Sequence, residues 1–255
     1  MIKEKIVNFI KESDRPIMDM ELKEIFNISK NEMEDFQKIL DGLVDTGVLL
    51  ATKKKKYGTP EMFSMLVGRV QVTQKGFGFF INDDADVSDV FIPPSELNSA
   101  MDGDRVFIKI TKIKEDGKRQ EGTIVKIIER KTVDVVGTFQ LSKTFGFVIP
   151  DNKRINSDIF IPYGKTGNAK TDDKVVARIT KYQEGDKKPE GKVTEVLGNK
   201  NEVGVDILSV IKKFDLPEAF PKKVLGAAAE IATDVDEDEI TNRRDLRDET
   251  IVTID

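Results

Sequence analysis

Apolar residues recur at helical spacing over the first 45 residues of the chain. Residues 2–12 carry apolar side chains every three or four positions, which predicts an amphipathic helix. A second, short helix is predicted over 19–26, with Asp19 as its candidate N-cap. The capping-box sequence at 29–32 precedes a third apolar stripe over 33–44, so a third helix is expected there.

The pattern then changes to strands around a lysine-rich tip. Residues 48–50 and 57–63 read as two strands on either side of the lysines at 53–56. Three short helices and a basic hairpin are typical of an α+β winged helix-turn-helix domain, which we place at residues 1–64. The third helix is rich in acidic residues, which favours an accessory or RNA-adjacent role over sequence-specific reading of DNA. A protein-docking domain is the alternative.

From residue 66 onward the chain repeats itself. The stretch Lys75–Phe80 returns as Lys143–Val148, 68 residues later at the central glycine. The sequence Asp-Val-Phe-Ile-Pro at 89–93 returns as Asp-Ile-Phe-Ile-Pro at 158–162, 69 residues later. Two copies of one domain are therefore expected.

Each copy alternates short strands with turns rich in glycine and charge. The expected strands are 68–72, 75–80, 90–92, 105–110 and 121–128 in the first copy, and 136–139, 145–148, 159–161, 175–179 and 190–196 in the second. Five short strands over about seventy residues predict a small all-β barrel of the OB-fold type. We place the barrels at residues 65–131 and 132–198.

The aromatic stretch is the candidate binding surface of each barrel. Side chains alternate along a strand, so Phe77 and Phe79 share one face while Phe80 turns inward, and Gly78 leaves the opposite side open. A leading lysine, Lys75, favours an aromatic face that meets nucleic-acid bases. The alternative is that the rings are hairpin core.

The two repeated motifs resemble the paired RNA-binding motifs of bacterial cold-shock domains. The resemblance implies two platforms on which bases stack, with a lysine beside each: Lys75, Phe77, Phe79 and Phe91 in the first copy, and Lys143, Phe145, Phe147 and Phe160 in the second. The sequence departs from the cold-shock pattern at Pro93 and Pro162, where a histidine often stands, and at Thr144, which replaces the glycine of the first copy. Ring stacking tolerates these changes, whereas one polar base contact is lost.

The composition excludes several kinds of chemical site. The 255 residues include neither cysteine nor histidine, which excludes disulfides, thiolate zinc sites and nucleophiles activated by histidine within this sequence. The net charge of −5 is uneven, because residues 226–255 hold ten acidic residues and three arginines while residues 51–75 are locally +5. That basic segment suits contact with phosphates. No apolar run is long enough for a signal peptide or a membrane span, so a cytoplasmic monomer is expected.

The last segment changes character again. Helices are predicted over 205–211 and 221–231, and the acidic run 234–239 reads as disordered surface. The closing run, with Arg-Asp-Leu-Arg at 244–247 and Thr-Ile-Asp at 253–255, resembles the opening of the catalytic domain in the ribonuclease II and ribonuclease R exonuclease family. The order of domains resembles the same family, which places the start of a truncated catalytic domain at residues 199–255.

This resemblance implies a 3′-to-5′ exoribonuclease that depends on Mg²⁺ and handles single-stranded and structured RNA. Asp255 matches the first of several aspartates that bind the metal in the family. One carboxylate cannot hold a two-metal site, so no complete catalytic set is expected and the chain alone is expected to be inactive. The alternatives are a stand-alone RNA chaperone and a winged-helix regulator that binds nucleic acid.

Overall fold

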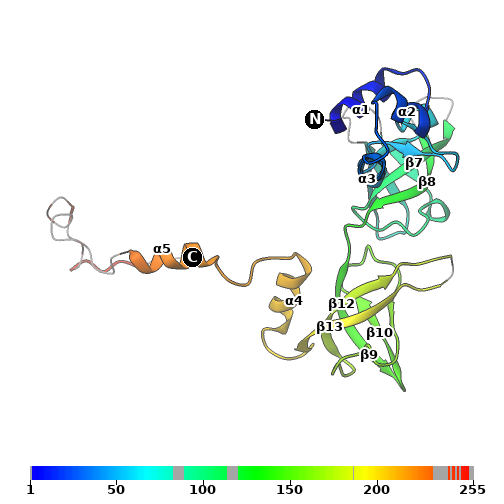
Figure 1. Cartoon of the computed structure of the whole chain (residues 1–255). Helices are drawn as coiled ribbons and strands as arrows, with labels where there is room; N and C mark the ends of the chain where they lie inside the picture. The colour runs from blue at the N-terminus through cyan, green and yellow to red at the C-terminus, as the bar shows by residue number, and fades with distance from the viewer. Residues whose placement is uncertain are drawn as a thin grey trace. The chain divides into compact units, whose positions relative to one another are not determined.

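The structure, a computed structural model, describes residues 2–82, 89–113, 120–185, 187–231, 241, 243–244, 246 and 248–252. The chain divides into two compact units, Met1–Lys213 and Phe214–Asp255, shown from blue to red in Figure 1. The acidic run 234–239 and Asp255 lie outside the described residues. Within the described part of the chain, no helix is long and apolar enough to cross a membrane.

Three helices and a small sheet form the N-terminal part. The helices are α1 (Ile2–Glu12), α2 (Asp19–Ile25) and α3 (Met33–Asp45), and the strands β1 (Ile17–Met18), β2 (Leu50–Ala51) and β3 (Lys56–Gly58) pair in the order β1-β3-β2. Ile6 and Ile10 of α1 and Leu40 of α3 are fully buried in one core with Leu49 and Tyr57. The apolar stripes of the predicted helices thus pack on one another and on the sheet.

Two local predictions were wrong here, and one short strand was missed. Asp19 is not an N-cap but the first residue of α2, where its carboxylate accepts a hydrogen bond from Lys23 Nζ at 2.8 Å. The strand expected over 57–63 ends at Gly58, because Pro60 starts a 3₁₀ turn in which the Phe63 N–H donates to the Pro60 carbonyl. Strand β1 was not predicted, since two residues are too few to show alternation.

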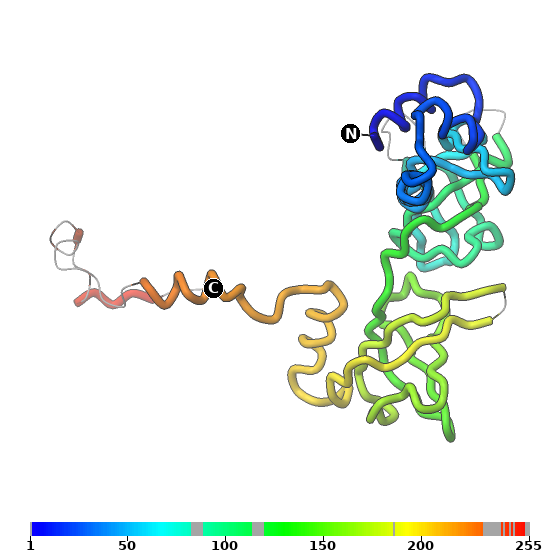
Figure 2. The backbone as a smooth tube through the Cα atoms, in the orientation of Figure 1, coloured from blue at the N-terminus to red at the C-terminus, as the bar shows by residue number. Residues whose placement is uncertain are grey.

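The two repeats fold as two closed five-stranded barrels, as expected from the pattern (Figure 2). The first has the order β4-β5-β6-β8-β7, with β4 (Leu66–Val72), β5 (Gly78–Asn82), β6 (Val90–Ile92), β7 (Arg105–Ile113) and β8 (Gln120–Glu129). The second has the order β10-β11-β13-β12-β9, with β9 (Asp134–Ser142), β10 (Phe145–Pro150), β11 (Ile159–Ile161), β12 (Asp173–Lys181) and β13 (Glu190–Asn199). A short 3₁₀ helix, η2 (Pro94–Glu96), follows β6.

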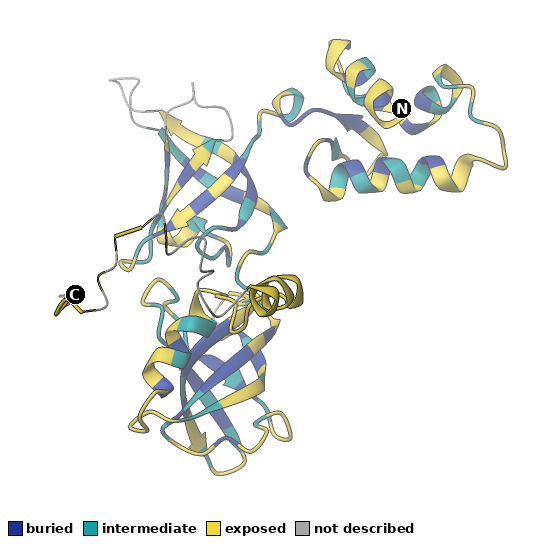
Figure 3. Cartoon of the chain, turned by 90° about the vertical axis from the view of Figure 1, so that its left-hand side faces the viewer, coloured by how far each residue is buried: buried dark blue, intermediate teal, exposed yellow. Residues whose placement is uncertain are grey.

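Each barrel encloses its own apolar core, seen as the dark blue inner positions of the strands in Figure 3. Phe80 fills the first core and Phe139 the second, both without exposed surface. A Cβ on Gly146 would lie 2.4 Å from the Phe139 ring. The expectation that the glycine of the aromatic motif leaves one side open was wrong, because that side faces a crowded core.

Helices follow the second barrel. Helix α4 (Val205–Lys213) buries Val205 and Ser209 and pairs Lys212 with Glu195 of β13 at 2.8 Å, so it packs on the barrel. Helix α5 (Lys222–Glu230) lies in the second compact unit and has no buried residue.

Candidate nucleic-acid interface

Three phenylalanines of the first barrel meet on its outer face. Phe79 of β5 is paired with Phe91 of β6, and their ring centroids lie 5.9 Å apart. Phe77, just before β5, places its ring 5.7 Å from Phe79 and 5.5 Å from Phe91. The strand pattern explains the orientation: Phe80, Val90 and Ile92 point into the core, so the side chains between them point out.

The second barrel repeats the cluster. Phe147 of β10 is paired with Phe160 of β11 at 5.7 Å, and Phe145 lies 5.7 Å from Phe147 and 5.6 Å from Phe160. We call these clusters the first triad (Phe77, Phe79, Phe91) and the second triad (Phe145, Phe147, Phe160). The structure therefore brings together all six predicted phenylalanines, three in each barrel.

The triads are not core. None of their six rings belongs to the buried core cluster of its barrel, and Phe79 keeps 36% of its surface exposed. Buried phenylalanines of the same barrels, such as Phe80 and Phe139, have 0%. Partly exposed rings in a cluster offer flat apolar faces to a ligand.

A row of polar side chains continues each triad across the sheet. In the first barrel Gln71 is paired with Phe79, Phe91 with Glu121, and Glu121 with Lys112. Paired residues share a face of the sheet, so an amide and an ion pair flank the rings. Lys112 Nζ lies 3.4 Å from Glu121 Oε2.

The second barrel carries the same row, residue for residue. Gln140 is paired with Phe147, Phe160 with Glu190, and Glu190 with Lys181, whose Nζ lies 2.8 Å from Glu190 Oε2. Sequence reasoning missed these flanking residues. The 69-residue offset holds for Gln71 and Gln140, Lys112 and Lys181, and Glu121 and Glu190, so extending the repeat alignment would have found them.

The two predicted lysines lie in hairpin turns and not on strands. Lys75 is exposed in the turn before β5, where Gly76 adopts a φ of +83°. In the second barrel β10 starts at Phe145, and the exposed Lys143 itself takes a φ of +46°. Thr144 stands where the first barrel has Gly76, and a β-branched residue is disfavoured at positive φ. The residue with positive φ is therefore Lys143, one position earlier than the glycine of the first barrel, and the second turn is shorter.

A further lysine covers the second triad. Lys188, in the loop before β13, places its Nζ 5.2 Å from the Phe147 ring centroid and 3.0 Å from Asp158 Oδ2. A cation over a ring face gains electrostatic energy, and at an exposed site this is about 0.5–1 kcal/mol. A stacking base would compete with Lys188 for the ring while its phosphate would attract the displaced ammonium.

The described residues do not assemble a metal site. No group of three acidic side chains that could hold a cation occurs among them. Mg²⁺ needs several oxygen ligands in octahedral positions, and Asp255, the single candidate, lies outside the described part of the chain.

Comparison with sequence families agrees with the two barrels. Residues 68–127 match the Ribonuclease B OB domain, and residues 147–221 match the Cold shock domain. The second match begins inside β10 and runs past α4, whereas the barrel itself closes with β9, which precedes the matched residues. Strand pairing places the barrel at Asp134–Asn199.

Three curated relatives of the chain are named ribonuclease R. The chain is 39% identical over 191 residues to ribonuclease R of Thermotoga maritima, covering 74% of this chain and 26% of that protein. It is 28% identical to ribonuclease R of Aquifex aeolicus, covering 100% of this chain and 35% of that protein, and 28% identical to that of Escherichia coli, covering 99% and 31%. The chain thus spans about a quarter to a third of the length of these relatives.

Solved structures share the fold. The apo form of Mycoplasma genitalium RNase R superposes with a TM-score of 0.58 at 20% identity, covering 66% of this chain and 27% of that one. The same enzyme in complex with ribose methylated single-stranded RNA gives 0.58 at 21% identity, covering 72% and 29%. Yeast Ssd1, a pseudonuclease, gives 0.53 at 17% identity, covering 64% and 26%.

Proposed function

The chain belongs to the ribonuclease R family, and from this premise we propose that it is an RNA-binding region of an exoribonuclease. The first and second triads serve as platforms on which the bases of single-stranded RNA stack. Stacking on an aromatic side chain contributes about 1–3 kcal/mol per base and accepts all four bases. The substrate is therefore RNA of mixed sequence.

The observation that carries the proposal is the repetition of one partly exposed aromatic cluster. Ring centroids lie 5.5–5.9 Å apart in the first triad and 5.6–5.7 Å apart in the second. Rings packed only for stability would be covered, whereas these are partly exposed in both barrels. Flanking amides and lysines supply groups for base edges and phosphates.

We extend the proposal to the whole enzyme. The platforms capture RNA and direct its 3′ end to a hydrolytic site that uses Mg²⁺, to which Asp255 contributes one ligand. We expect the chain by itself not to hydrolyse RNA, because its described residues contain no group of three or more acidic side chains that could hold a metal ion. Incubation of the purified chain with Mg²⁺ and labelled RNA tests this: we expect no release of mononucleotides, and metal-dependent release would overturn it.

The N-terminal part is proposed to act as a winged helix-turn-helix domain that contacts structured RNA. Its hairpin tip carries the exposed lysines 53–56, which can approach phosphates. We propose the division 1–64, 65–131, 132–198 and 199–255, and the order of the helical part and the two barrels supports it. Helix α4 packs on the second barrel, so the second compact unit starts at Phe214.

Fluorescence anisotropy with a labelled single-stranded RNA of about 16 nucleotides tests the function, since one OB fold covers about 4–16 nucleotides. We expect tighter binding to this RNA than to a duplex DNA of equal length, with an affinity that falls as salt rises. Strong preference for one DNA duplex would favour the winged-helix regulator. Absence of any RNA binding would overturn the proposal.

A further inference from the structure

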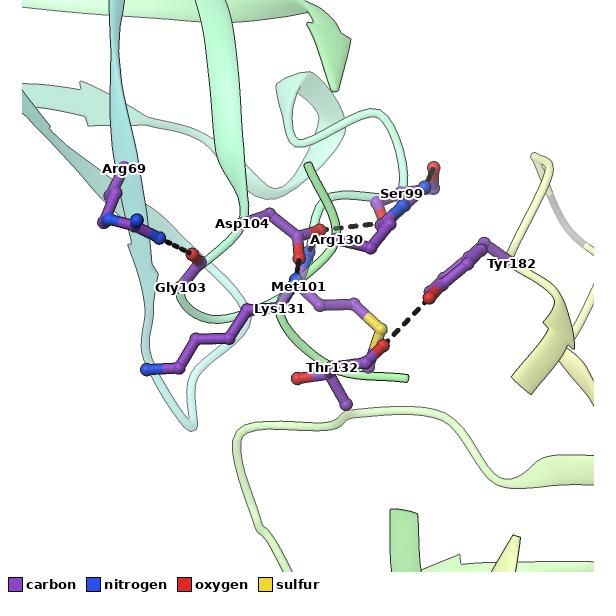
Figure 4. Close-up of polar contacts among 9 residues, drawn as sticks. All are labelled: Arg69, Ser99, Met101, Gly103, Asp104, Arg130, Lys131, Thr132 and Tyr182. Atoms are coloured by element: carbon purple, nitrogen blue, oxygen red, sulfur yellow. Dashed lines mark hydrogen bonds and ion pairs between the residues drawn. The ribbon is translucent and has the colours of Figure 1, made fainter. Parts of the chain in front are cut away.

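The linker between the barrels, residues 130–133, is fixed to the first barrel through Arg130 (Figure 4). The Arg130 guanidinium donates from Nη1 to the Ser99 carbonyl at 2.7 Å and to Asp104 Oδ2 at 3.0 Å, and from Nη2 to Ser99 Oγ at 3.1 Å. The linker backbone joins in, because the Lys131 N–H donates to Asp104 Oδ1 at 2.9 Å.

Asp104 is the buried centre of this arrangement. Its side chain has no exposed surface, and its Oδ2 also accepts the Met101 N–H at 2.9 Å. Burial raises the pKa of Asp104 above its ordinary value, and the backbone N–H groups and Arg130 oppose this rise. Removing the cation from a buried carboxylate strongly destabilises the folded protein. The pairing with Asp104 therefore holds the Arg130 side chain firmly in place.

The other face of Arg130 meets the second barrel. The guanidinium carbon lies 3.8 Å from the ring centroid of Tyr182, which follows β12. The Tyr182 hydroxyl then donates to the carbonyl of Thr132 in the linker at 2.9 Å. One tyrosine thus holds both a side chain and the backbone of the linker (Figure 4).

A second pair of contacts crosses between the barrels. Arg154, in the loop after β10, donates from Nη1 to Asp102 Oδ2 of the first barrel at 2.8 Å. Met101 of the first barrel packs against the core cluster of the second. The barrels therefore touch through apolar and charged groups as well as through the linker.

Comparison of the two repeats shows which of these residues belong to the barrel fold and which occur only at the linker. Asp104 has a counterpart in Asp173, which accepts the Lys170 N–H at 2.8 Å in the equivalent turn. Arg130 and Tyr182 have none, because the 69-residue offset places Asn199 and the exposed Ile113 at the matching positions. A closed barrel of this type forms without the arginine and the tyrosine, so the barrel fold does not require them. Tyr182 also packs against the core cluster of the second barrel, which connects that core to the joint.

We propose that Arg130 and Tyr182 form a latch that holds the two barrels in one fixed relation, so that a single RNA strand engages both triads. They are positioning residues, since they act through the barrels and not on the RNA. A rigid joint raises the effective concentration of the second triad once the first is occupied. The proposal has two parts. The mechanical part, that Arg130 and Tyr182 fix the two barrels relative to each other, stands on the contacts alone. The RNA part, that one strand then engages both triads, rests on the proposed function.

The mechanical part is tested without RNA. The chain has no cysteine, so Val125→Cys and Val196→Cys, both exposed strand positions, give one spin label in each barrel. We expect a narrow distance distribution for the chain with intact Arg130 and Tyr182, and a broad one after Tyr182→Leu. Arg130→Lys, which keeps the charge but loses the planar stack, should also broaden it. An unchanged distribution in both variants would overturn the latch.

Arg178→Lys is the matched control for Arg130→Lys. Arg178 donates to Asp134 at 2.8 Å from both Nε and Nη2, within the second barrel and exposed to solvent. This variant makes the same replacement of a guanidinium by an ammonium group as Arg130→Lys, yet it should leave the distribution narrow. Circular dichroism melts of all variants check that each barrel remains folded.

The RNA part is tested by strand length. We expect Tyr182→Leu to weaken binding of an oligouridylate of about 16 nucleotides by about 10-fold or more, and to leave one of about 4 nucleotides unchanged. Equal losses at both lengths, or no loss, would overturn the RNA part. If the unaltered chain binds neither oligonucleotide, the proposed function fails, while the spin-label distances still decide the latch.

Discussion

Phe79 and Phe91 lie directly opposite each other on antiparallel neighbours β5 and β6, with their ring planes inclined by 65°. If a base stacks on this pair, Phe79→Ala should weaken binding of single-stranded RNA by about 5- to 150-fold, which corresponds to about 1–3 kcal/mol. The free energy of unfolding should change little, because the ring is already partly in water. Anisotropy titrations and urea unfolding measure the two effects.

Phe80→Ala is the matched control for that prediction. Phe80 is the next residue on the same strand, but its ring is fully buried in the barrel. Its loss should cost about 3–5 kcal/mol of unfolding free energy. The platform would be refuted by a Phe79→Ala variant that unfolds as easily as Phe80→Ala and still binds RNA normally.

Local alternation and repetition predicted both barrels, and the resemblance to cold-shock domains added the six rings of the triads. Each signal lies within a few residues: Val90 and Ile92 are apolar on either side of Phe91, which assigns Phe91 to the opposite face. Repetition at an offset of 69 residues then identified the second copy. The ends of strands were predicted less well, because turn conformations such as the positive φ of Gly76 decide where β5 starts.

Features that depend on contacts between distant segments were not predictable from the pattern. Gln71 flanks Phe79 only because of the β4–β5 register, and Glu121 reaches Phe91 only through a parallel pairing across the closed barrel. The contact of Arg130 with Tyr182 joins two copies of the repeat. Nothing near either residue in the sequence indicates its partner.

The flanking amides should tune which base is preferred. Gln71 is exposed and paired with Phe79, so its amide can donate to and accept from the edge of a stacked base. Gln71→Ala should reduce the spread of affinities among oligouridylate, oligoadenylate and oligocytidylate, by about 2- to 12-fold for the preferred base, as expected for one hydrogen bond. An equal loss for all three would instead mean that Gln71 contacts the sugar-phosphate backbone.

Replacing Lys188 and replacing Asp158 should change the affinity for RNA in opposite directions. Lys188 lies over Phe147 and pairs with Asp158 at 3.0 Å. Lys188→Met should lower the slope of log affinity against log salt by about 0.7, because one phosphate contact to a single strand is lost. Asp158→Asn frees the lysine for phosphate and should tighten binding. Anisotropy over a salt series measures both effects. A loss of RNA affinity in both variants would contradict the prediction.

The latch should open at alkaline pH through Tyr182. Burial is the main cause that raises the pKa of Tyr182 above its ordinary value of 10.0. Arg130 opposes this rise, Asp104 and Asp134 add to it, and the net rise means that the folded chain favours the protonated hydroxyl. The hydroxyl therefore stabilises the joint fully below pH 10 and loses this effect as pH rises through its raised pKa, where it can no longer donate to the Thr132 carbonyl.

The distribution of distances between spin labels at Val125→Cys and Val196→Cys should stay narrow up to about pH 10 and broaden above it. Tyr182→Phe lacks the hydroxyl and should show no change over the same range. Identical broadening in both proteins would assign the effect to other groups, such as the lysines, and would refute the role of this hydrogen bond.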